Sequence, residues 1–275
     1  MPTSEPPADG RQAAPDAAPS DRAPAEQTPS EQAPSEHAPP TRALPVRAEG
    51  LSLRGARGWV FRDVALDVPA GGLVALTGIA GSGRTALLLS LSGRMKPTSG
   101  TATVGDLALP ADLRAVQRVT ALGAVTGVTD LDPALSVREH VSEALDLREG
   151  VFGRWRGRSA RIRRALDEVG LGDLDPKALA EELDPDQAQL LGAALGLVGR
   201  PGVLMLDDVD EGLPLDRQRA LWQRLRAIAD SGVTVLATCH DSAPADGLAQ
   251  RVELPDPRAA LSDAPSTTPA EEEPR

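Results

Sequence analysis

Hydrophobic residues in the middle of the chain form short continuous runs, separated by longer stretches with helical spacing. Four mostly apolar runs predict buried strands at residues 73–77, 119–125, 203–206 and 233–238. Apolar residues at helical spacing predict helices at residues 85–91, 136–146, 156–169, 187–198 and 216–229. Strands that alternate with helices predict an α/β domain with a mainly parallel sheet.

Two further pairs of strands are predicted outside this alternation. Residues 47–53 and 58–68 are joined by a Gly-Ala-Arg-Gly turn at 55–58. Short strands at 101–104 and 107–109 follow a break in the chain at the Pro-Thr-Ser-Gly segment 97–100.

Proline separates this middle from the two ends of the chain. Of the 25 prolines, eleven lie in residues 1–45 and five in 255–275. Residues 23–37 repeat proline every fifth position, which blocks helix and sheet, and they hold too little apolar surface to offset the entropy of ordering. We therefore predict disordered tails at 1–45 and 255–275 around one domain at 46–254. A docking arm for a partner is the alternative for the first tail.

Charge and composition narrow the class of protein. The 275 residues carry a formal net charge of −11, and both tails are acidic. This argues against a nucleic-acid-binding protein that depends on electrostatic attraction to the phosphate backbone. The single cysteine, Cys239, leaves no internal disulfide and no cysteine-rich metal site. No run of 18 apolar residues and no apolar stretch of signal-peptide length occurs. We expect a cytosolic protein.

The clearest chemical motif is Gly-Ile-Ala-Gly-Ser-Gly-Arg-Thr at residues 78–85. It follows a predicted strand and opens a predicted helix, which is the setting of a phosphate-binding loop. Glycines let backbone N–H groups close around phosphate oxygens, and the start of a helix adds favourable potential. The hydroxyl of Thr85 is suited to Mg²⁺. An ordinary glycine-rich turn between a strand and a helix is the alternative.

Arg84 stands where the usual pattern GxxxxGK[ST] has lysine. Lysine carries a compact point charge, whereas the guanidinium group is a larger planar fork. Arginine can still bind phosphate, but we expect it not to reproduce the geometry of lysine.

Other segments accompany the loop in order along the chain. They are Trp-Val-Phe-Arg-Asp-Val-Ala-Leu-Asp-Val at 59–68, Pro-Thr-Ser-Gly at 97–100, Ser-Val-Arg-Glu at 136–139, Val-Leu-Met-Leu-Asp-Asp at 203–208 and Thr-Val-Leu-Ala-Thr-Cys-His-Asp at 234–241. Together they resemble the nucleotide-binding subunit of ATP-binding cassette (ABC) transporters over residues 46–254. The resemblance implies an α/β, P-loop ABC-type cassette. Its mainly parallel sheet core carries an antiparallel β subdomain and a helical subdomain at about residues 128–200.

The resemblance implies ATP and Mg²⁺ as ligands and assigns roles to residues. The nucleotide-binding set is Gly78, Ile79, Ala80, Gly81, Ser82, Gly83, Arg84, Thr85 and Ala86. Thr85 and Asp207 are implied to hold Mg²⁺. His240 is implied to contact the γ-phosphate, and Asp208 to orient or deprotonate the attacking water. The alternatives are a solvated acid at a strand end for Asp208 and a hydrogen-bonded histidine beside the sheet for His240.

Several family landmarks are altered. The family has glutamate at position 208, and aspartate is one methylene shorter, which can cost about a hundredfold in rate. The glutamine loop lacks its name residue, with Gly127 nearest the expected position, and the loop 211–214 lacks the family's aspartate.

The family signature Leu-Ser-Gly-Gly-Gln appears as Leu-Asp-Pro-Asp-Gln at 183–187. Pro185 removes an N–H donor, and Asp184 and Asp186 place carboxylates where the family binds the γ-phosphate of the opposite subunit. We interpret one of these two acids as the N-cap of the following helix.

Aromatic and basic residues offer two weaker indications. The family's adenine-stacking aromatic is missing near Gly55, and we expect Trp59 and Phe61 to pack on the sheet instead of replacing it. Arginines gather around Phe152 and Trp155, at positions 148, 154, 156, 158, 161, 163 and 164. They predict either a solvated helix face or a docking surface for a membrane subunit or anionic lipid.

Three functions compete on this basis. The first is a transporter subunit that binds MgATP, pairs as a homodimer or heterodimer with another cassette, and couples to an integral membrane subunit, with weak or lost hydrolysis. Such a subunit is cytoplasmic and peripheral at the inner face of the cell membrane. The second is a non-catalytic cassette kept for assembly or regulation. The third, a soluble cassette acting on ribosomes or DNA, fits the acidic chain poorly, and no nucleic-acid partner is expected.

Overall fold

The computed structural model describes residues 42–149 and 157–259, which fall within one compact unit of the chain, residues 39–275. Of the tails predicted at 1–45 and 255–275, residues 1–41 and 260–275 lie outside the described residues. Leu44 and Pro45, at the edge of the first tail, hydrogen-bond to the fold: the Leu44 N–H donates to the Gly202 carbonyl at 3.2 Å, and the Gly105 N–H donates to the Pro45 carbonyl at 2.8 Å.

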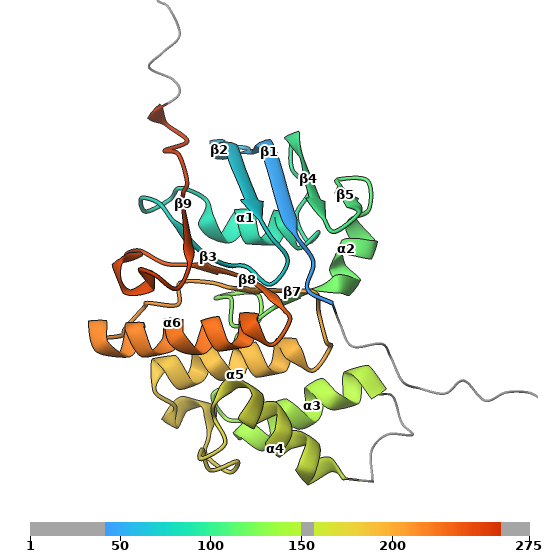
Figure 1. The fold of residues 1–275 in the computed structure, drawn as a ribbon, viewed down its shortest axis with the longest axis vertical. Coiled ribbons are helices and arrows are strands. Elements are labelled where there is room, and N and C mark those ends of the chain that lie inside the picture. Colours follow the sequence, from blue (N-terminus) through green and yellow to red (C-terminus); the bar gives the residue numbers. More distant parts are fainter. Residues whose placement is uncertain (1–41, 150–156, 260–275) are drawn as a thin grey trace, which may run out of the picture. The chain divides into compact units, whose positions relative to one another are not determined.

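Two sheets form the core, and both are seen in Figure 1. The antiparallel sheet has the order β2-β1-β4-β5, with β1 (Val46–Gly55), β2 (Gly58–Val68), β4 (Ser99–Val104) and β5 (Leu107–Leu109). The parallel sheet has the order β6-β7-β8-β3-β9, with β3 (Leu73–Thr77), β6 (Thr120–Leu122), β7 (Val203–Leu206), β8 (Thr234–Thr238) and β9 (Gln250–Glu253). The α/β class with a mainly parallel sheet is confirmed.

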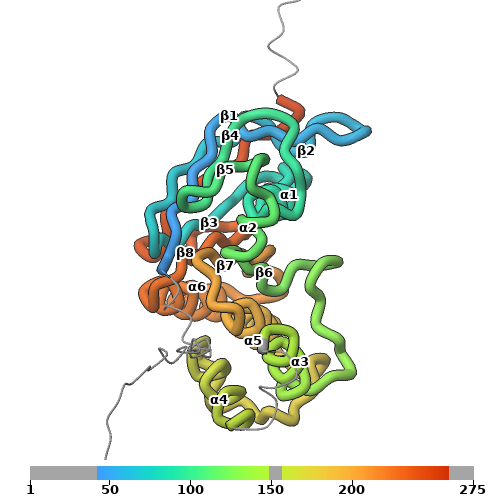
Figure 2. The backbone as a smooth tube through the Cα atoms, turned by 90° about the vertical axis from the view of Figure 1, so that its right-hand side faces the viewer, coloured from blue at the N-terminus to red at the C-terminus, as the bar shows by residue number. Residues whose placement is uncertain are grey.

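Helices cover both faces of the parallel sheet. They are α1 (Arg84–Leu91), α2 (Leu113–Val119), α3 (Val137–Glu149), α4 (Arg158–Val169), α5 (Pro185–Leu197) and α6 (Leu215–Asp230). Helix α1 lies between the two sheets, and α5 and α6 lie on the other face of the parallel sheet (Figure 1). Helices α3 and α4 lie beyond α5 on the side away from the sheet, as Figure 2 shows.

The central strands alternate their side chains between two hydrophobic clusters. In β7, Val203 and Met205 join α1 and the antiparallel sheet, whereas Leu204 and Leu206 join α5 and α6. A strand buried on both faces needs apolar residues at every position, which is why these strands appear in the sequence as continuous apolar runs.

One α-helix and one strand were not predicted from the sequence, and one predicted strand was too long. Helix α2 has only seven residues and fully buries only Val116, with Leu113 and Val119 partly buried against the same cluster, and β9 has no fully buried residue. The strand predicted at 119–125 is shorter in the structure, where β6 covers only Thr120–Leu122. It begins after Val119 because α2 extends to that residue. No helix in the described ranges combines the length and hydropathy needed to cross a bilayer.

We predict that Trp222→Ala in α6 lowers the free energy of unfolding by about 3–5 kcal/mol, measured by chemical denaturation. Trp222 is 0% exposed and is among the largest fully buried side chains, so its removal leaves a cavity. Leu215→Ala is the matched control, because Leu215 lies on the same helix and is 66% exposed. The control should change stability by no more than about 0.5 kcal/mol. Equal losses in both variants would contradict the packing of α6.

Candidate functional site

The glycine-rich loop joins the end of β3 to the start of α1, as the motif predicts. Gly83 caps α1 with a left-handed backbone (φ 85°), and a Cβ there would lie 2.4 Å from the Val60 carbonyl oxygen. Gly81 has φ 81°, and a Cβ there would meet nothing within 4 Å. One side of the loop is thus packed on β2, and the other faces open space.

The remaining loop residues are also either exposed to solvent or packed against the fold. Ile79 and Ala80 are exposed, and Ser82 is buried with its N–H donating to the Ile79 carbonyl at 3.0 Å. The Ser82 hydroxyl has no hydrogen-bond partner among the described residues. Gly78 packs tightly over it, because a Cβ at Gly78 would lie 2.5 Å from the Ser82 hydroxyl oxygen. Ala86, half-buried in the first turn of α1, completes the predicted set.

Thr85, in the first turn of α1, and Asp207, directly after β7, lie together beside the parallel sheet. The Thr85 hydroxyl donates to Asp207 Oδ2 at 2.6 Å. The other oxygen, Oδ1, accepts from the Thr238 hydroxyl at 2.5 Å. The two residues predicted to hold Mg²⁺ are therefore adjacent although 122 positions separate them.

This pair suits Mg²⁺ only together with further oxygen ligands. A hydroxyl and a carboxylate are the hard oxygen donors that Mg²⁺ prefers, and this ion is usually held by one or two carboxylates with phosphates and water. Across residues 42–149 and 157–259, no group of three or more His, Cys, Asp or Glu is arranged to hold a metal ion. The donor set fits a magnesium ion brought with a phosphate ligand.

Arg84 points beneath the loop and is 8% exposed. Its Nη1 donates to the Gly78 carbonyl at 3.1 Å and to the Cys239 carbonyl at 2.8 Å. Its Nη2 lies 3.0 Å from Asp208 Oδ1 and 3.1 Å from His240 Nε2. The one cation of the loop is thus bonded to both predicted catalytic residues. We call Arg84, Asp208 and His240 the arginine cluster.

Asp208 follows β7 in a left-handed conformation (φ 41°), which aspartate tolerates better than most residues. Its N–H donates to the Thr238 hydroxyl at 2.7 Å. Burial raises the pKa of the Asp208 carboxyl above its usual value and Asp207 adds to this, whereas Arg84 and His240 lower it. A raised pKa makes the carboxylate a better base, but the hydrogen bond from Arg84 occupies its Oδ1.

His240 lies on the loop after β8, with its side chain 56% exposed. Its backbone N–H donates to Asp210 Oδ2 at 2.8 Å, and its Nδ1 lies 3.3 Å from Asp210 Oδ1. The residue before it, Cys239, is fully buried, and this burial raises the pKa of its thiol to about 12. The thiol is therefore protonated and inert, while its backbone carbonyl holds Arg84.

The altered signature begins α5. Asp184 is the N-cap, as predicted for one of the two acids, and its N–H donates to Gln187 Oε1 at 3.1 Å. Both acids also accept from Arg217 of α6, Asp184 at 2.9 Å and Asp186 at 2.7 Å. Arg217 therefore offsets the negative charge that these acids bring to the signature.

The other sequence candidates are separate from this cluster. Gly127 donates its N–H to the Asp130 carboxylate oxygens at 3.0 and 2.9 Å, within an exposed loop. Phe61 is 0% exposed in the core, which confirms sheet packing. Trp59 is flanked by the guanidinium groups of Arg54 and Arg62, at 5.5 and 5.3 Å from the ring centroid.

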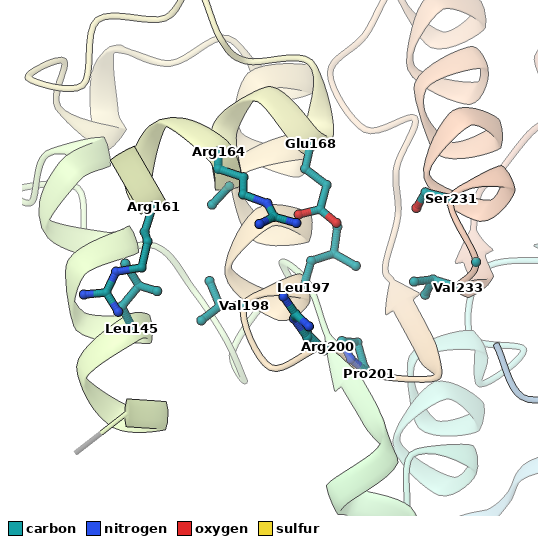
Figure 3. A pocket seen from close by; sticks show the side chains of 12 residues that line it. Leu145, Arg161, Arg164, Glu168, Leu197, Val198, Arg200, Pro201, Ser231 and Val233 are labelled. Atoms are coloured by element: carbon teal, nitrogen blue, oxygen red, sulfur yellow. The ribbon is translucent and has the colours of Figure 1, made fainter. Parts of the chain in front are cut away.

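The arginines predicted to gather around Phe152 and Trp155 are partly engaged with neighbouring groups. Phe152, Trp155, Arg154 and Arg156 lie outside the described residues. Arg158 pairs with Asp146 at 2.7 Å. Arg161 and Arg164 line a cavity of about 370 Å³ together with Arg200, and no residue of the phosphate loop lines it. Figure 3 shows Arg161, Arg164 and Glu168 projecting from α4, and Arg200 following α5.

Sequence reasoning missed three residues that shape the site. Thr238 holds both Asp207 and Asp208, Asp210 holds His240, and Arg217 holds the signature acids. Their partners are 30 or more positions away, so spacing carries no signal for them. The only available hint is that Asp210 is an acid within the segment that follows a buried strand.

Comparison with known proteins agrees with this geometry. The family model for ABC transporters matches residues 61–210. The chain is 34% identical over 198 residues to the Nod factor export ATP-binding protein I of Burkholderia lata, covering 70% of this chain and 62% of that protein. It is 31% identical over 197 residues to the Fe(3+) ions import ATP-binding protein FbpC of Pseudomonas fluorescens, covering 70% of this chain and 53% of that protein.

The solved structures include a similar fold. The structure of cbiO1 from Clostridium perfringens, part of the ABC transporter complex cbiONQ, matches with a TM-score of 0.65 at 18% identity and covers 79% of this chain and 90% of that chain. The chain spans about three fifths of the length of the first curated relatives it matches. With the glycine-rich loop, the strand β7 ahead of Asp207 and the two-sheet core in place, this chain belongs to the ABC transporter family.

Proposed function

We propose that this chain is the nucleotide-binding subunit of an ABC transporter, which binds MgATP and hydrolyses it slowly or not at all. The observation that carries the nucleotide assignment is the 2.6 Å hydrogen bond between Thr85 and Asp207 beside an open glycine loop. The hydroxyl of Thr85, at the end of the phosphate loop, and the carboxylate of Asp207, directly after β7, meet where a phosphate-bound magnesium ion needs them.

Different groups of the site would bind the phosphates and the magnesium ion. Backbone N–H groups of the loop at 78–83 and the start of α1 would surround the phosphates. Thr85 and Asp207 would hold Mg²⁺, and Thr238 keeps Asp207 oriented through the opposite carboxylate oxygen. The ion would neutralise charge on the phosphates.

The arginine cluster supports weak nucleotide binding. Arg84 has partners on two backbone carbonyls, on Asp208 and on His240, so it must release some of them to reach a phosphate. The Asp208 carboxylate also places a negative charge near the incoming phosphates, and like charges in a partly desolvated site oppose binding.

The same contacts support slow hydrolysis. Asp208 and His240 are the residues proposed to handle the attacking water and the γ-phosphate, and both are bonded to Arg84. Asp208 is also shorter than the usual glutamate, so its carboxylate has less reach toward a water molecule.

A second subunit would complete each nucleotide site, as a homodimer or as a heterodimer with another cassette. The segment 183–187 would then face the phosphate of the opposite subunit. Arg217 reduces the repulsion between these carboxylates and the phosphate, because it pairs with Asp184 and Asp186. In a homodimer both sites would combine an altered loop with an altered signature.

A membrane subunit is the proposed partner, which would place the chain in the cytoplasm at the inner face of the cell membrane. The relatives are named as export and import proteins, so either direction of transport is compatible. The proposed contact surface is a groove of about 330 Å³ between α3 and the segment after β6, lined by Thr129, His140, Leu147 and Arg148 among others. Leu147 is 81% exposed on this side, which suits an apolar partner.

The non-catalytic cassette is the second candidate. It is favoured by one observation: within the arginine cluster, Arg84, Asp208 and His240 are hydrogen-bonded to one another without any nucleotide. A cassette kept for assembly needs this fold but no turnover.

We predict that the purified full-length chain releases phosphate from MgATP little faster than its Asp207→Asn variant, which lacks the magnesium carboxylate. Phosphate release and calorimetric MgATP binding are measured on both. Turnover well above the variant, in the ordinary range of roughly 1–10³ per second, would reject slow hydrolysis. Absence of MgATP binding up to millimolar concentration would reject the nucleotide-binding function itself.

We further predict that Asp208→Asn tightens MgATP binding about tenfold, measured by calorimetry, because it removes one negative charge and loosens the hold on Arg84. Asp230→Asn is the matched control: it also breaks an arginine–aspartate pair, with Arg226 at 2.8 Å, but on the exposed end of α6. Unchanged or weaker binding in Asp208→Asn would show that Arg84 is not restrained by this acid.

A further inference from the structure

Asp210 is a buried acid to which the family motifs give no role. Its side chain is 5% exposed, three positions after the magnesium-side Asp207. Buried carboxylates are unfavourable unless hydrogen bonds or charges compensate them, so the partners of Asp210 are informative.

Within residues 42–149 and 157–259, the three hydrogen-bond contacts of the Asp210 carboxylate all lie on the loop that carries His240. Oδ2 accepts from the backbone N–H groups of His240 at 2.8 Å and of Asp241 at 3.1 Å. Oδ1 lies 3.3 Å from His240 Nδ1. One carboxylate therefore fixes both the backbone and the ring of His240.

The contact on the opposite side of the ring shows which nitrogen carries the proton. Arg84 has only donors, and its Nη2 lies 3.1 Å from His240 Nε2. Nε2 must therefore be the acceptor. In a neutral imidazole the proton is then on Nδ1, where it points to Asp210 Oδ1.

We propose that Asp210 is a positioning residue that fixes His240 in the Nδ1–H tautomer and so turns an acceptor, not a donor, toward the phosphate side. In this state His240 completes the arginine cluster, but its Nε2 has no proton to offer a γ-phosphate oxygen. Asp210 thereby favours the nucleotide-free arrangement over recognition of the third phosphate. The effect on recognition of the third phosphate rests on the proposed nucleotide-binding function. The assignment of the His240 tautomer to Asp210 does not depend on that function.

The test is Asp210→Asn, which keeps the size of the side chain. The asparagine oxygen can retain the two backbone N–H groups, and its NH₂ group then faces Nδ1. Nδ1 must accept, the proton moves to Nε2, and Nε2–H meets the donors of Arg84. We expect two-bond ¹H–¹⁵N spectra of the full-length chain, labelled at its three histidines, to show His240 change from the Nδ1–H to the Nε2–H tautomer. The same tautomer in both proteins would overturn the proposal.

Two further variants keep the proposal falsifiable even if Asp210→Asn folds poorly. Arg84→Met removes the guanidinium group and leaves Asp210 in place. The Nδ1–H tautomer should persist if Asp210 sets it, and a mixture would assign it to Arg84 instead. Asp241→Asn is the matched control, because Asp241 is an exposed neighbour whose carboxylate accepts from the Ala243 N–H at 2.8 Å. It should leave the tautomer unchanged.

Nucleotide affinity provides the second readout. Because Nε2–H can donate to a γ-phosphate oxygen, Asp210→Asn should tighten MgATP about tenfold more than MgADP, which lacks that phosphate. Equal changes for both nucleotides would indicate only the loss of a charge and would overturn the effect on the third phosphate. If the unmodified chain binds neither nucleotide, the proposed function fails, while the tautomer result still decides the role of Asp210.

Discussion

The guanidinium group of Arg84 is the interaction on which the rest of the site depends. It joins the phosphate loop, the end of β7 and the loop after β8 through four partners, at distances of 2.8 to 3.1 Å. A compact ammonium group has no planar fork with which to reach partners in several directions at once. The replacement of lysine by arginine therefore changes the state of the whole site, because three segments are held together before any phosphate arrives.

The parallel sheet explains why these segments meet. β3, β7 and β8 are neighbours in one sheet and run the same way, so their carboxyl ends lie along one edge. The phosphate loop, the two acids after β7 and the histidine after β8 all leave from that edge. The apolar strands give this edge its rigidity, and the polar groups beyond them set its chemistry.

The sequence predicts the parts of this protein that follow from local patterns of residues. It misses the parts that depend on contacts between distant positions. Apolar runs identify β3, β7 and β8, and glycine spacing identifies the phosphate loop, because both patterns are local. Helix α2 and strand β9 are missed, since few of their side chains are buried. The position of the Arg84 side chain follows from the fold and not from its neighbours in sequence, because its side-chain partner Asp208 is 124 positions away.

Arg84 and Asp208 appear in the sequence as two separate departures from the family pattern, but they are physically one change. The longer cation and the shorter acid meet at 3.0 Å, with the arginine 9% and the aspartate 32% exposed. Substitutions at two residues in such contact do not have additive effects. The change in stability caused by one substitution therefore depends on which residue stands at the other position. Restoring lysine alone would leave a partly buried acid with less compensation, and restoring glutamate alone would push a longer carboxylate against a guanidinium that is already held. The two positions must therefore be considered together with His240 and Asp210, which complete the same chain of contacts.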